Sequence, residues 1–394
     1  MRELKAQIVV VGGGIAGLWT HALLRKRGFD AVLVEKTALG SDQTLASQGM
    51  IHGGQRYNLE GRKTRHAELI APMPRVWGDC LAGTGEIDLS GTRVLEARQF
   101  MWSPGGLLSN VSAFVGSRIL NTQTENPPRE EWPEVFRMTK DFRGRLYRMN
   151  EVVLDAKSLV RNIAEPGHNH IYRVEIEDIV HEGDRVRYLA GRTGENDQIT
   201  LHADTYIFAA GTFNEVAADA LGIGKSATQR RPLRQVMVGP LPYRLYAHCI
   251  TTDPRPRVTV TAHPLPGGDY VWYLGGLVAV RGADTSDDEA IDFARKEMAA
   301  LFPAIDWDRL TWDTWYGDRA EPAANDGFLP DGPEIKTTAN AALVWPTKLT
   351  FAPAVGTLVA NWIDGLDVAP RTADPLDLPA CPVGQYPWEG REWR

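Results

Sequence analysis

Six residues near the start of the chain have the types and spacing of a phosphate-binding turn. The segment Gly12-Gly13-Gly14-Ile15-Ala16-Gly17 has glycine at its first, third and sixth positions. There, Gly12 would make the tight turn, Gly14 would let a pyrophosphate approach the backbone, and Gly17 would let helix and strand pack closely. Glu35 follows at roughly the 20-residue spacing of an acid that accepts hydrogen bonds from an adenosine ribose. The pattern predicts a bound dinucleotide, and an acid at this position favours FAD or NAD over a 2′-phosphorylated cofactor.

Five further side chains are candidate catalytic residues: His52, Arg56, His248, Arg319 and Lys348. A histidine can accept or donate a proton near neutral pH. A guanidinium can bind two oxygens of a carboxylate or a phosphate. The alternatives are structural roles, namely hydrogen-bonded histidines and surface charges or ion pairs for the basic residues.

The sequence predicts a strand before the glycine-rich turn, and a helix and a second strand after it. Gln7–Val11 is a short β-branched run, typical of a strand buried on both faces of a parallel sheet. Leu18–Arg27 has helical character and ends at Gly28, which tolerates positive φ. Ala31–Val34 then predicts a second strand that ends in Glu35.

A second segment, Asp204–Thr212, predicts a strand that runs into a turn of small residues. Two apparent strands precede it, Ile171–Ile179 and Arg185–Leu189, so we expect a three-stranded meander that returns to the first sheet. This arrangement resembles flavoproteins with the two-dinucleotide-binding fold, in which such a turn passes beside FAD. Because the chain has no second G-x-G-x-x-G, we expect no separate NAD(P)H domain and a substrate held directly at the flavin.

The loop Thr44–Tyr57 resembles the Ser-Ser-Lys-Leu-Ile-His-Gly-Gly-x-Arg-Tyr loop of flavin-dependent glycerol-3-phosphate dehydrogenases. The matching residues are Ile51, His52, Gly53, Gly54, Arg56 and Tyr57, whereas Gln48 and Gly49 replace a serine and a lysine. The resemblance implies that His52 is a base or hydrogen-bond donor and that Arg56 is an anion anchor. It also implies a substrate-site role for His248, which stands at a similar strand position.

The region from Trp315 to Pro353 resembles the end of the D-amino-acid oxidase superfamily, including glycine oxidase. In that superfamily an arginine binds substrate and a glycine-rich or Lys-Leu-Thr turn caps the flavin pyrimidine. The resemblance implies substrate binding by Arg319 and stabilisation of reduced flavin by Lys348, which lies in Thr347-Lys348-Leu349-Thr350. A helix predicted over Ala354–Ile363 would add the positive end of its dipole.

The middle of the chain predicts a second sheet. Pro232-Leu233-Arg234-Gln235-Val236 resembles the Pro-x-Arg-Gly strand of the same superfamily, and strands are expected at Tyr243–Thr251, Arg257–Ala262 and Tyr270–Gly275. The expected fold class is α/β, with a Rossmann-like FAD-binding domain that contains a mixed central sheet and the meander. An α+β substrate domain on a mixed, largely antiparallel sheet completes it. We expect residues 1–60, 150–225 and 336–380 in the first domain, 61–149 and 226–335 in the second, and a tail at 381–394.

Composition narrows the classes of partner. The 394 residues include 43 Lys and Arg against 50 Asp and Glu, a net charge of −7, so we expect no nucleic-acid partner. The three cysteines form no C-x-x-C pair, which predicts neither a disulfide framework nor a metal site and fits a cytoplasmic protein. No stretch approaches the roughly 20 apolar residues of a spanning helix. We therefore expect no signal peptide or transmembrane segment, while peripheral membrane contact stays open.

Together these features predict an FAD-dependent oxidoreductase that oxidises a small, anionic amine or alcohol by hydride transfer to flavin N5. The acceptor is O2, a quinone or a carrier, and the protein is a monomer or small homo-oligomer. The alternatives are an NAD-dependent dehydrogenase, a flavin-dependent tRNA-modifying enzyme and a flavin-bound protein without turnover. The candidate FAD contacts are Gly12, Gly14, Ile15, Ala16, Gly17, Glu35, Lys36, Ala46, Ser47, Gln48, Gly49, Met50, Val174, Ala210, Gly211, Thr347, Lys348, Leu349 and Thr350.

Overall fold

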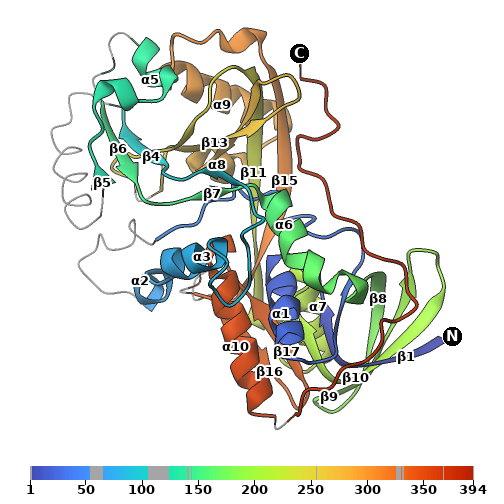
Figure 1. The fold of residues 1–394 in the computed structure, drawn as a ribbon. Helices are drawn as coiled ribbons and strands as arrows, with labels where there is room; N and C mark the ends of the chain where they lie inside the picture. The colour runs from blue at the N-terminus through green and yellow to red at the C-terminus, as the bar shows by residue number, and fades with distance from the viewer. Residues whose placement is uncertain are drawn as a thin grey trace.

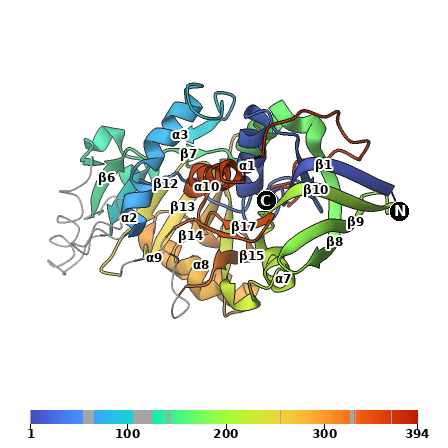
Figure 2. The ribbon, with the colours of Figure 1, turned by 90° about the horizontal axis from the view of Figure 1, so that it is seen from below.

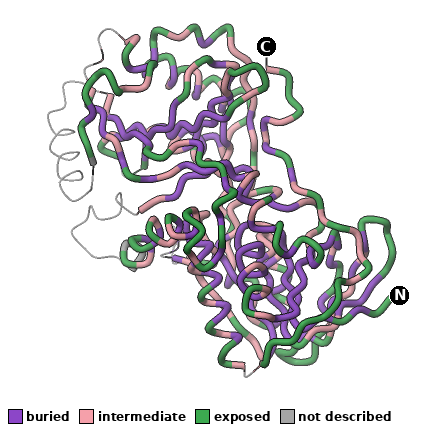
Figure 3. The backbone as a smooth tube through the Cα atoms, in the orientation of Figure 1, coloured by how far each residue is buried: buried purple, intermediate pink, exposed green. Residues whose placement is uncertain are grey.

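Two bodies, each built around one large β-sheet, make up the part of the chain that the structure describes (Figure 1). The structure is a computed structural model, and it describes residues 2–53, 65–104, 124–139, 142, 144–253, 255–324, 330, 332–366 and 368–393. Buried residues are concentrated inside the two bodies (Figure 3). Among the helices in these ranges, none has the length and apolar character needed to cross a bilayer.

The first sheet begins with the unit predicted around the glycine-rich turn. Strand β1 (Arg2–Val11) is followed by helix α1 (Ile15–Lys26) and strand β2 (Ala31–Glu35), and the two strands pair in parallel. Ile8 joins one hydrophobic cluster and its neighbour Val9 joins another. Strand β1 is therefore buried on both faces, as its β-branched run predicts.

The expected meander returns to this sheet. Strands β8 (Ile171–Glu182), β9 (Arg185–Thr193) and β10 (Gln198–Phe208) follow one another with antiparallel pairing. Strand β10 then pairs in parallel with β1 along its length. Strands β17 (Ala341–Trp345) and β16 (Glu334–Thr337) extend the sheet beyond β10.

Helices cover both faces of the first sheet. Helix α10 (Ala352–Asp364) lies beside α1 on one face (Figure 2), and α6 (Ala156–Ala164) packs against α1. Helix α7 (Asn214–Ala220) contributes to the hydrophobic cluster on the other face. Helix α10 begins two residues before the predicted start because Pro353 fits its first turn, where the N–H that proline lacks has no helical partner.

The second sheet is mixed and largely antiparallel, as predicted. Its only parallel pair among the described strands is β12–β4. The spatial order is β15 (Thr311–Pro322), β11 (Thr228–Leu241), β14 (Tyr270–Gly275), β13 (Val258–Pro264), β12 (Tyr246–Cys249), β4 (Phe100–Ser103), β6 (Arg145–Met149) and β5 (Thr124–Glu125). Helices α8 (Leu277–Gly282) and α9 (Asp287–Leu301) pack against β11. The predicted fold class is thus confirmed.

Two regions differ in detail from the sequence-based expectations. The strand expected over Tyr243–Thr251 is limited to β12. Helices α2 (Arg65–Ile70) and α3 (Met73–Leu81), which the division above placed with the second domain, contribute Ile70 and Trp77 to the core around α1 and α10. The domain division stays a proposal, and we propose to assign residues 65–89 to the first body. The shorter elements are α5 (Glu134–Met138), β3 (Val94–Glu96) and β7 (Val153–Leu154).

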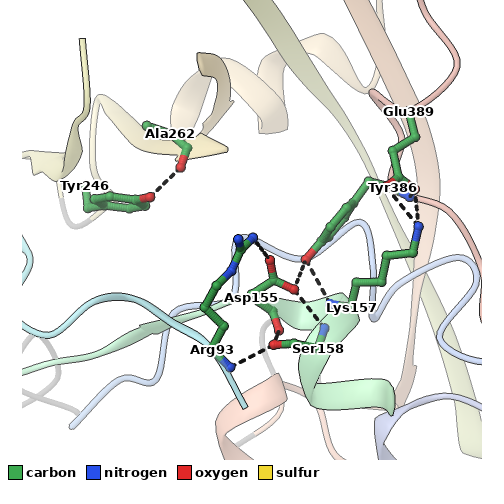
Figure 4. A network of polar contacts seen from close by, with 8 residues as sticks. All are labelled: Arg93, Asp155, Lys157, Ser158, Tyr246, Ala262, Tyr386 and Glu389. Atoms are coloured by element: carbon green, nitrogen blue, oxygen red, sulfur yellow. Dashed lines mark hydrogen bonds and ion pairs between the residues drawn. The ribbon is translucent and has the colours of Figure 1, made fainter. Parts of the chain in front are cut away.

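The C-terminal tail runs from the first body along the second (Figure 1). Its Tyr386 hydroxyl accepts a hydrogen bond from the Lys157 backbone N–H at 2.8 Å and lies 3.1 Å from Asp155 Oδ1. Glu389 pairs with Lys157 at 2.6 Å (Figure 4). Further on, Arg391 pairs with Asp313 of β15. The tail is therefore fixed to both bodies by polar contacts.

Candidate functional site

A cavity of about 650 Å³ lies where the carboxyl ends of β1, β2 and β10 face strands β11 and β15 of the second sheet. Ligands of open α/β sheets bind outside the carboxyl ends of the strands. The cavity is therefore placed as the dinucleotide prediction requires.

Two glycines shape the turn at one end of the cavity. Gly12 has φ of 109°, and a Cβ there would lie 2.4 Å from the Ala209 carbonyl oxygen. A Cβ on Gly17 would lie 1.9 Å from the Gly12 carbonyl oxygen, so only glycine lets α1 approach the turn. At Gly14 a Cβ would meet protein only at 3.5 Å, so the space beside this backbone belongs to the cavity.

Glu35 closes the other side of this turn. Its Oε2 accepts the Gly13 N–H at 2.7 Å, and its Oε1 accepts the Thr37 N–H at 2.9 Å. A carboxylate has about four lone-pair sites, so Glu35 retains acceptor capacity toward the cavity that it lines. The N-terminus of α1 lies beside it, where backbone N–H groups and the helix dipole favour phosphate.

Most of the candidate FAD contacts line this one cavity. They are Gly12, Gly14, Ile15, Ala16, Glu35, Lys36, Ala46, Ser47, Val174, Ala210, Gly211, Thr347, Lys348 and Leu349. Segments far apart in sequence therefore meet at one site.

Gly17, Gln48, Gly49, Met50 and Thr350 do not line the cavity. Gln48 reaches the second sheet, where its Nε2 donates to the Tyr273 carbonyl at 2.9 Å and its Oε1 accepts from Thr259 Oγ1 at 2.6 Å. The Gly49 carbonyl accepts the Leu154 N–H at 2.8 Å, and Met50 forms a β-bridge with Val153. In this structure Gln48, Gly49 and Met50 connect segments of the chain.

Thr350 braces the turn that carries Lys348. Its carbonyl accepts the Trp77 indole N–H at 2.9 Å, and its Oγ1 accepts the His52 backbone N–H at 3.1 Å. Thr347 has φ of 58°, and the backbone then enters a 3₁₀ turn at Leu349–Phe351. These contacts hold Lys348 at the cavity wall.

Arg319, on β15, presents a desolvated cation to the cavity. Its Nε donates to the Arg231 carbonyl at 3.2 Å and its Nη2 to the Pro232 carbonyl at 3.4 Å. Burial, and then the charge of Arg231, lower the pKa of Arg319 to about 10. Glu321 pairs with Arg231, and among the described residues no carboxylate forms an ion pair with Arg319. The site therefore favours an anionic ligand.

His52 and His248 come together around a carboxylate that sequence reasoning missed. Their ring centroids lie 5.7 Å apart, and Glu151 Oε2 is 3.4 Å from His52 Nδ1. Gln99 donates from Nε2 to Glu151 Oε2 at 3.3 Å and lies 2.8 Å, through Oε1, from His248 Nε2. Glu151 and Gln99 carry no sequence signal, since neither belongs to a recognised motif. Arg56 lies outside the described residues.

Two imidazoles and a carboxylate are also a donor set for a divalent metal. Ligand atoms of His52, Glu151 and His248 all lie within 4.8 Å of one another. In this structure, however, hydrogen bonds through Gln99 already connect the group. We therefore interpret it as a polar network.

Three polar atoms at the cavity have no hydrogen-bond partner within the described ranges: Gln235 Oε1, Trp345 Nε1 and Thr347 Oγ1. Buried polar groups in native proteins are nearly always paired. These atoms, the space beside Gly14 and the spare acceptor capacity of Glu35 fit a bound polar ligand.

Comparison with known proteins identifies the family. The family described as FAD dependent oxidoreductase matches residues 7–362. The chain belongs to this FAD-dependent oxidoreductase family. Its cofactor is FAD, and the residues that line the cavity fit that cofactor.

Individual relatives agree with this membership. The chain is 40% identical over 392 residues to the probable FAD-dependent oxidoreductase PA4991 of Pseudomonas aeruginosa, with 98% of each chain covered. The crystal structure of PA4991 superposes with a TM-score of 0.82 at 36% identity, covering 99% of both chains.

Glycine oxidase from Geobacillus kaustophilus superposes with a TM-score of 0.64 at 16% identity, covering 95% of this chain and 99% of that one. L-α-glycerophosphate oxidase from Mycoplasma pneumoniae gives 0.66 at 16% identity, covering 94% and 97%. At this identity the two enzymes share the fold with this FAD-dependent oxidoreductase.

Proposed function

We propose that this FAD-dependent oxidoreductase oxidises a small anionic amine or alcohol. The observation that carries the proposal is Arg319, a half-buried guanidinium at the cavity without a carboxylate partner among the described residues. A carboxylate or phosphate would restore the electrostatic stabilisation that burial has removed, through two parallel hydrogen bonds. This contact would fix the orientation of the substrate, which is a main source of rate enhancement.

The remaining roles follow from the chemistry of the oxidation. FAD, held by the residues that line the cavity, would supply the two-electron oxidation, by which the substrate would become an imine or a carbonyl compound. The proton from the neighbouring N–H or O–H must go to a base, a role we propose for the His52 and His248 pair, although neither histidine is among the residues that line the cavity in this structure. We assign to Lys348, at the cavity wall, the stabilisation of negative charge in the reduced state. Similarity to glycine oxidase and L-α-glycerophosphate oxidase agrees with both substrate classes.

The test is an anaerobic screen of the FAD-loaded protein. Amino acids, N-methyl amines, hydroxy acids and polyol phosphates are mixed with it, and loss of the yellow flavin absorbance is followed. We expect bleaching by at least one anionic compound, and Arg319→Gln to slow it at least tenfold at low substrate concentration. The matched control is Arg309→Gln, at an exposed arginine outside the cavity.

Bleaching only by neutral compounds, or equal rates in the two arginine variants, would contradict the anionic substrate. A protein that no compound reduces would support the flavin-bound alternative without turnover. Salt-sensitive binding of tRNA would favour the tRNA-modifying alternative. Oxygen consumption after reduction then separates O2 from a quinone or carrier as the acceptor.

A further inference from the structure

Strands β11 and β15 present one face to the cavity with a polar group at each end. They pair antiparallel, with Gln235 opposite Trp315 and Arg231 opposite Arg319. Residues two apart on a strand share a face. Leu233 and Gly317, which are also paired, therefore lie between the two ends, and both line the cavity.

Gln235 supplies a polar group that the proposed function does not use. The residue is 8% exposed, lines the cavity, and its Oε1 has no hydrogen-bond partner among the described residues. Gln48 provides a contrast, because both ends of its amide are bonded to the second sheet. A buried acceptor without a donor is costly. The Gln235 amide is therefore placed to receive a ligand.

Trp315 forms an apolar surface between the two ends. A Cβ on Gly317 would lie 2.2 Å from Cη2 of the Trp315 indole and 2.7 Å from its Cζ2. The six-membered ring thus covers Gly317 and extends along β15 toward Arg319. Together with Leu233 it makes an apolar strip along the cavity wall.

The guanidinium of Arg319 fixes the length of this strip. It is bound to the carbonyls of Arg231 and Pro232, and Pro232 is three residues from Gln235 on β11. Three residues of a strand span about 10 Å. A ligand that contacts both polar ends must therefore be elongated.

We propose that the substrate is an elongated anion with a second polar group. Its acidic group binds Arg319, its apolar middle packs on Trp315 and Leu233, and a polar group at the far end hydrogen-bonds to the Gln235 amide. This inference shares one assumption with the proposed function, namely that Arg319 binds the anionic group of the substrate, and it rests on the proposed function in that respect alone. It excludes glycine-sized acids as preferred ligands.

The test measures binding of non-reacting acids to the FAD-loaded protein through the change in the visible flavin spectrum. The probes are butyrate, hexanoate and octanoate, each compared with its ω-hydroxy counterpart. In the wild type we expect affinity to rise about threefold per added CH2 and one ω-hydroxy acid to bind about fivefold more tightly than its parent.

Three variants show which residue causes each effect. Gln235→Leu should abolish the preference for the hydroxy acid while leaving the parent acid and bound FAD unchanged. Gly317→Ala should displace the indole and weaken the dependence on chain length. Arg319→Gln should reduce binding of every acid equally.

The outcomes separate the two proposals. Binding that depends on Arg319 but shows no preference for any hydroxy acid overturns the second polar contact alone. Loss of FAD, or an altered resting flavin spectrum, in Gln235→Leu also overturns it, because the amide would then serve the cofactor. Failure of every acid to bind, or no effect of Arg319→Gln, overturns the anion anchor and this proposal with it.

Discussion

Nδ1 of His52 lies 3.4 Å from Oε2 of Glu151, a buried carboxylate whose Oε1 accepts the Gly53 N–H at 2.7 Å. One carboxylate thus orients His52 directly and His248 through Gln99. Because both histidines depend on Glu151, it is a positioning residue for the proton transfer proposed above.

Glu151→Gln preserves the shape of this side chain and removes its charge. We expect the rate of anaerobic flavin reduction to fall at least tenfold at saturating substrate, since general bases typically contribute more than that. Binding of simple acids through Arg319 should change little. Stopped-flow reduction and acid titration of the same preparation measure the two effects, and Glu182→Gln, at an exposed glutamate, is the control. Unchanged reduction would contradict the role.

Gly17 and Gly78 form a matched pair of helical glycines with opposite surroundings. Gly17→Ala places a Cβ 1.9 Å from the Gly12 carbonyl oxygen, so we expect a loss of about 1–3 kcal/mol in the free energy of unfolding and reduced FAD content. Gly78→Ala meets nothing within 4 Å and should stabilise α3 by about 0.5–1 kcal/mol. Urea unfolding and flavin absorbance check both. Equal effects of the two substitutions would refute the close packing of α1.

Glu35 anchors both the glycine turn and, by our proposal, the adenosine ribose. Glu35→Ala removes a charged acceptor, which is typically worth about 1.5–3 kcal/mol, so FAD should bind roughly 10–100-fold more weakly. Titration of FAD-free protein with FAD, followed by flavin fluorescence, gives the dissociation constant. Glu177→Ala on β8 is an exposed control outside the cavity. An unchanged dissociation constant for Glu35→Ala would exclude the proposed contact.

Two buried histidines predict how stability depends on pH. Burial lowers the pKa of His21 to about 3, and burial likewise lowers that of His263 to about 3. Between pH 3 and 6.5 the unfolded chain therefore binds more protons than the folded one. The stability contributed by these neutral side chains is complete above pH 6.5 and is lost as pH falls, by up to about 1.4 kcal/mol per pH unit for each histidine.

Urea unfolding of wild type and His263→Phe across this pH range tests the prediction. Phenylalanine keeps an aromatic ring against Trp388, whose ring centroid lies 4.1 Å from that of His263, but it cannot be protonated. The variant should lose stability less steeply on acidification. Parallel curves for the two proteins would show that His263 does not contribute.

Sequence patterns predicted the parts of the fold that depend on residues close together in the chain. The strand–turn–helix around Gly12 and the meander each arise from neighbouring residues, and both are found. Most of the predicted FAD contacts also line the cavity, because they lie in turns of recognisable sequence at the ends of the strands.

Long-range partners were not predictable in this way. Glu151 and Gln99 acquire their roles only when the second sheet places β12 beside β4. Gln48 was expected at the cofactor because it lies in the loop that resembles that of glycerol-3-phosphate dehydrogenases, yet its side chain is hydrogen-bonded to the second sheet. The sequence does show that Gln235 is unusual, since it stands where the Pro-x-Arg-Gly pattern has glycine. Only the structure shows that its side chain lines the cavity.

β1, α1 and β2 leave the ribosome before β17 and α10, which lie against β10 and α1 and come from residues 341–364. Until that late segment is synthesised, the free edge of β10 and the apolar flank of α1 are exposed, and such surfaces promote aggregation. The first body can therefore complete its packing around the nucleotide site only after residues 341–364 have been translated.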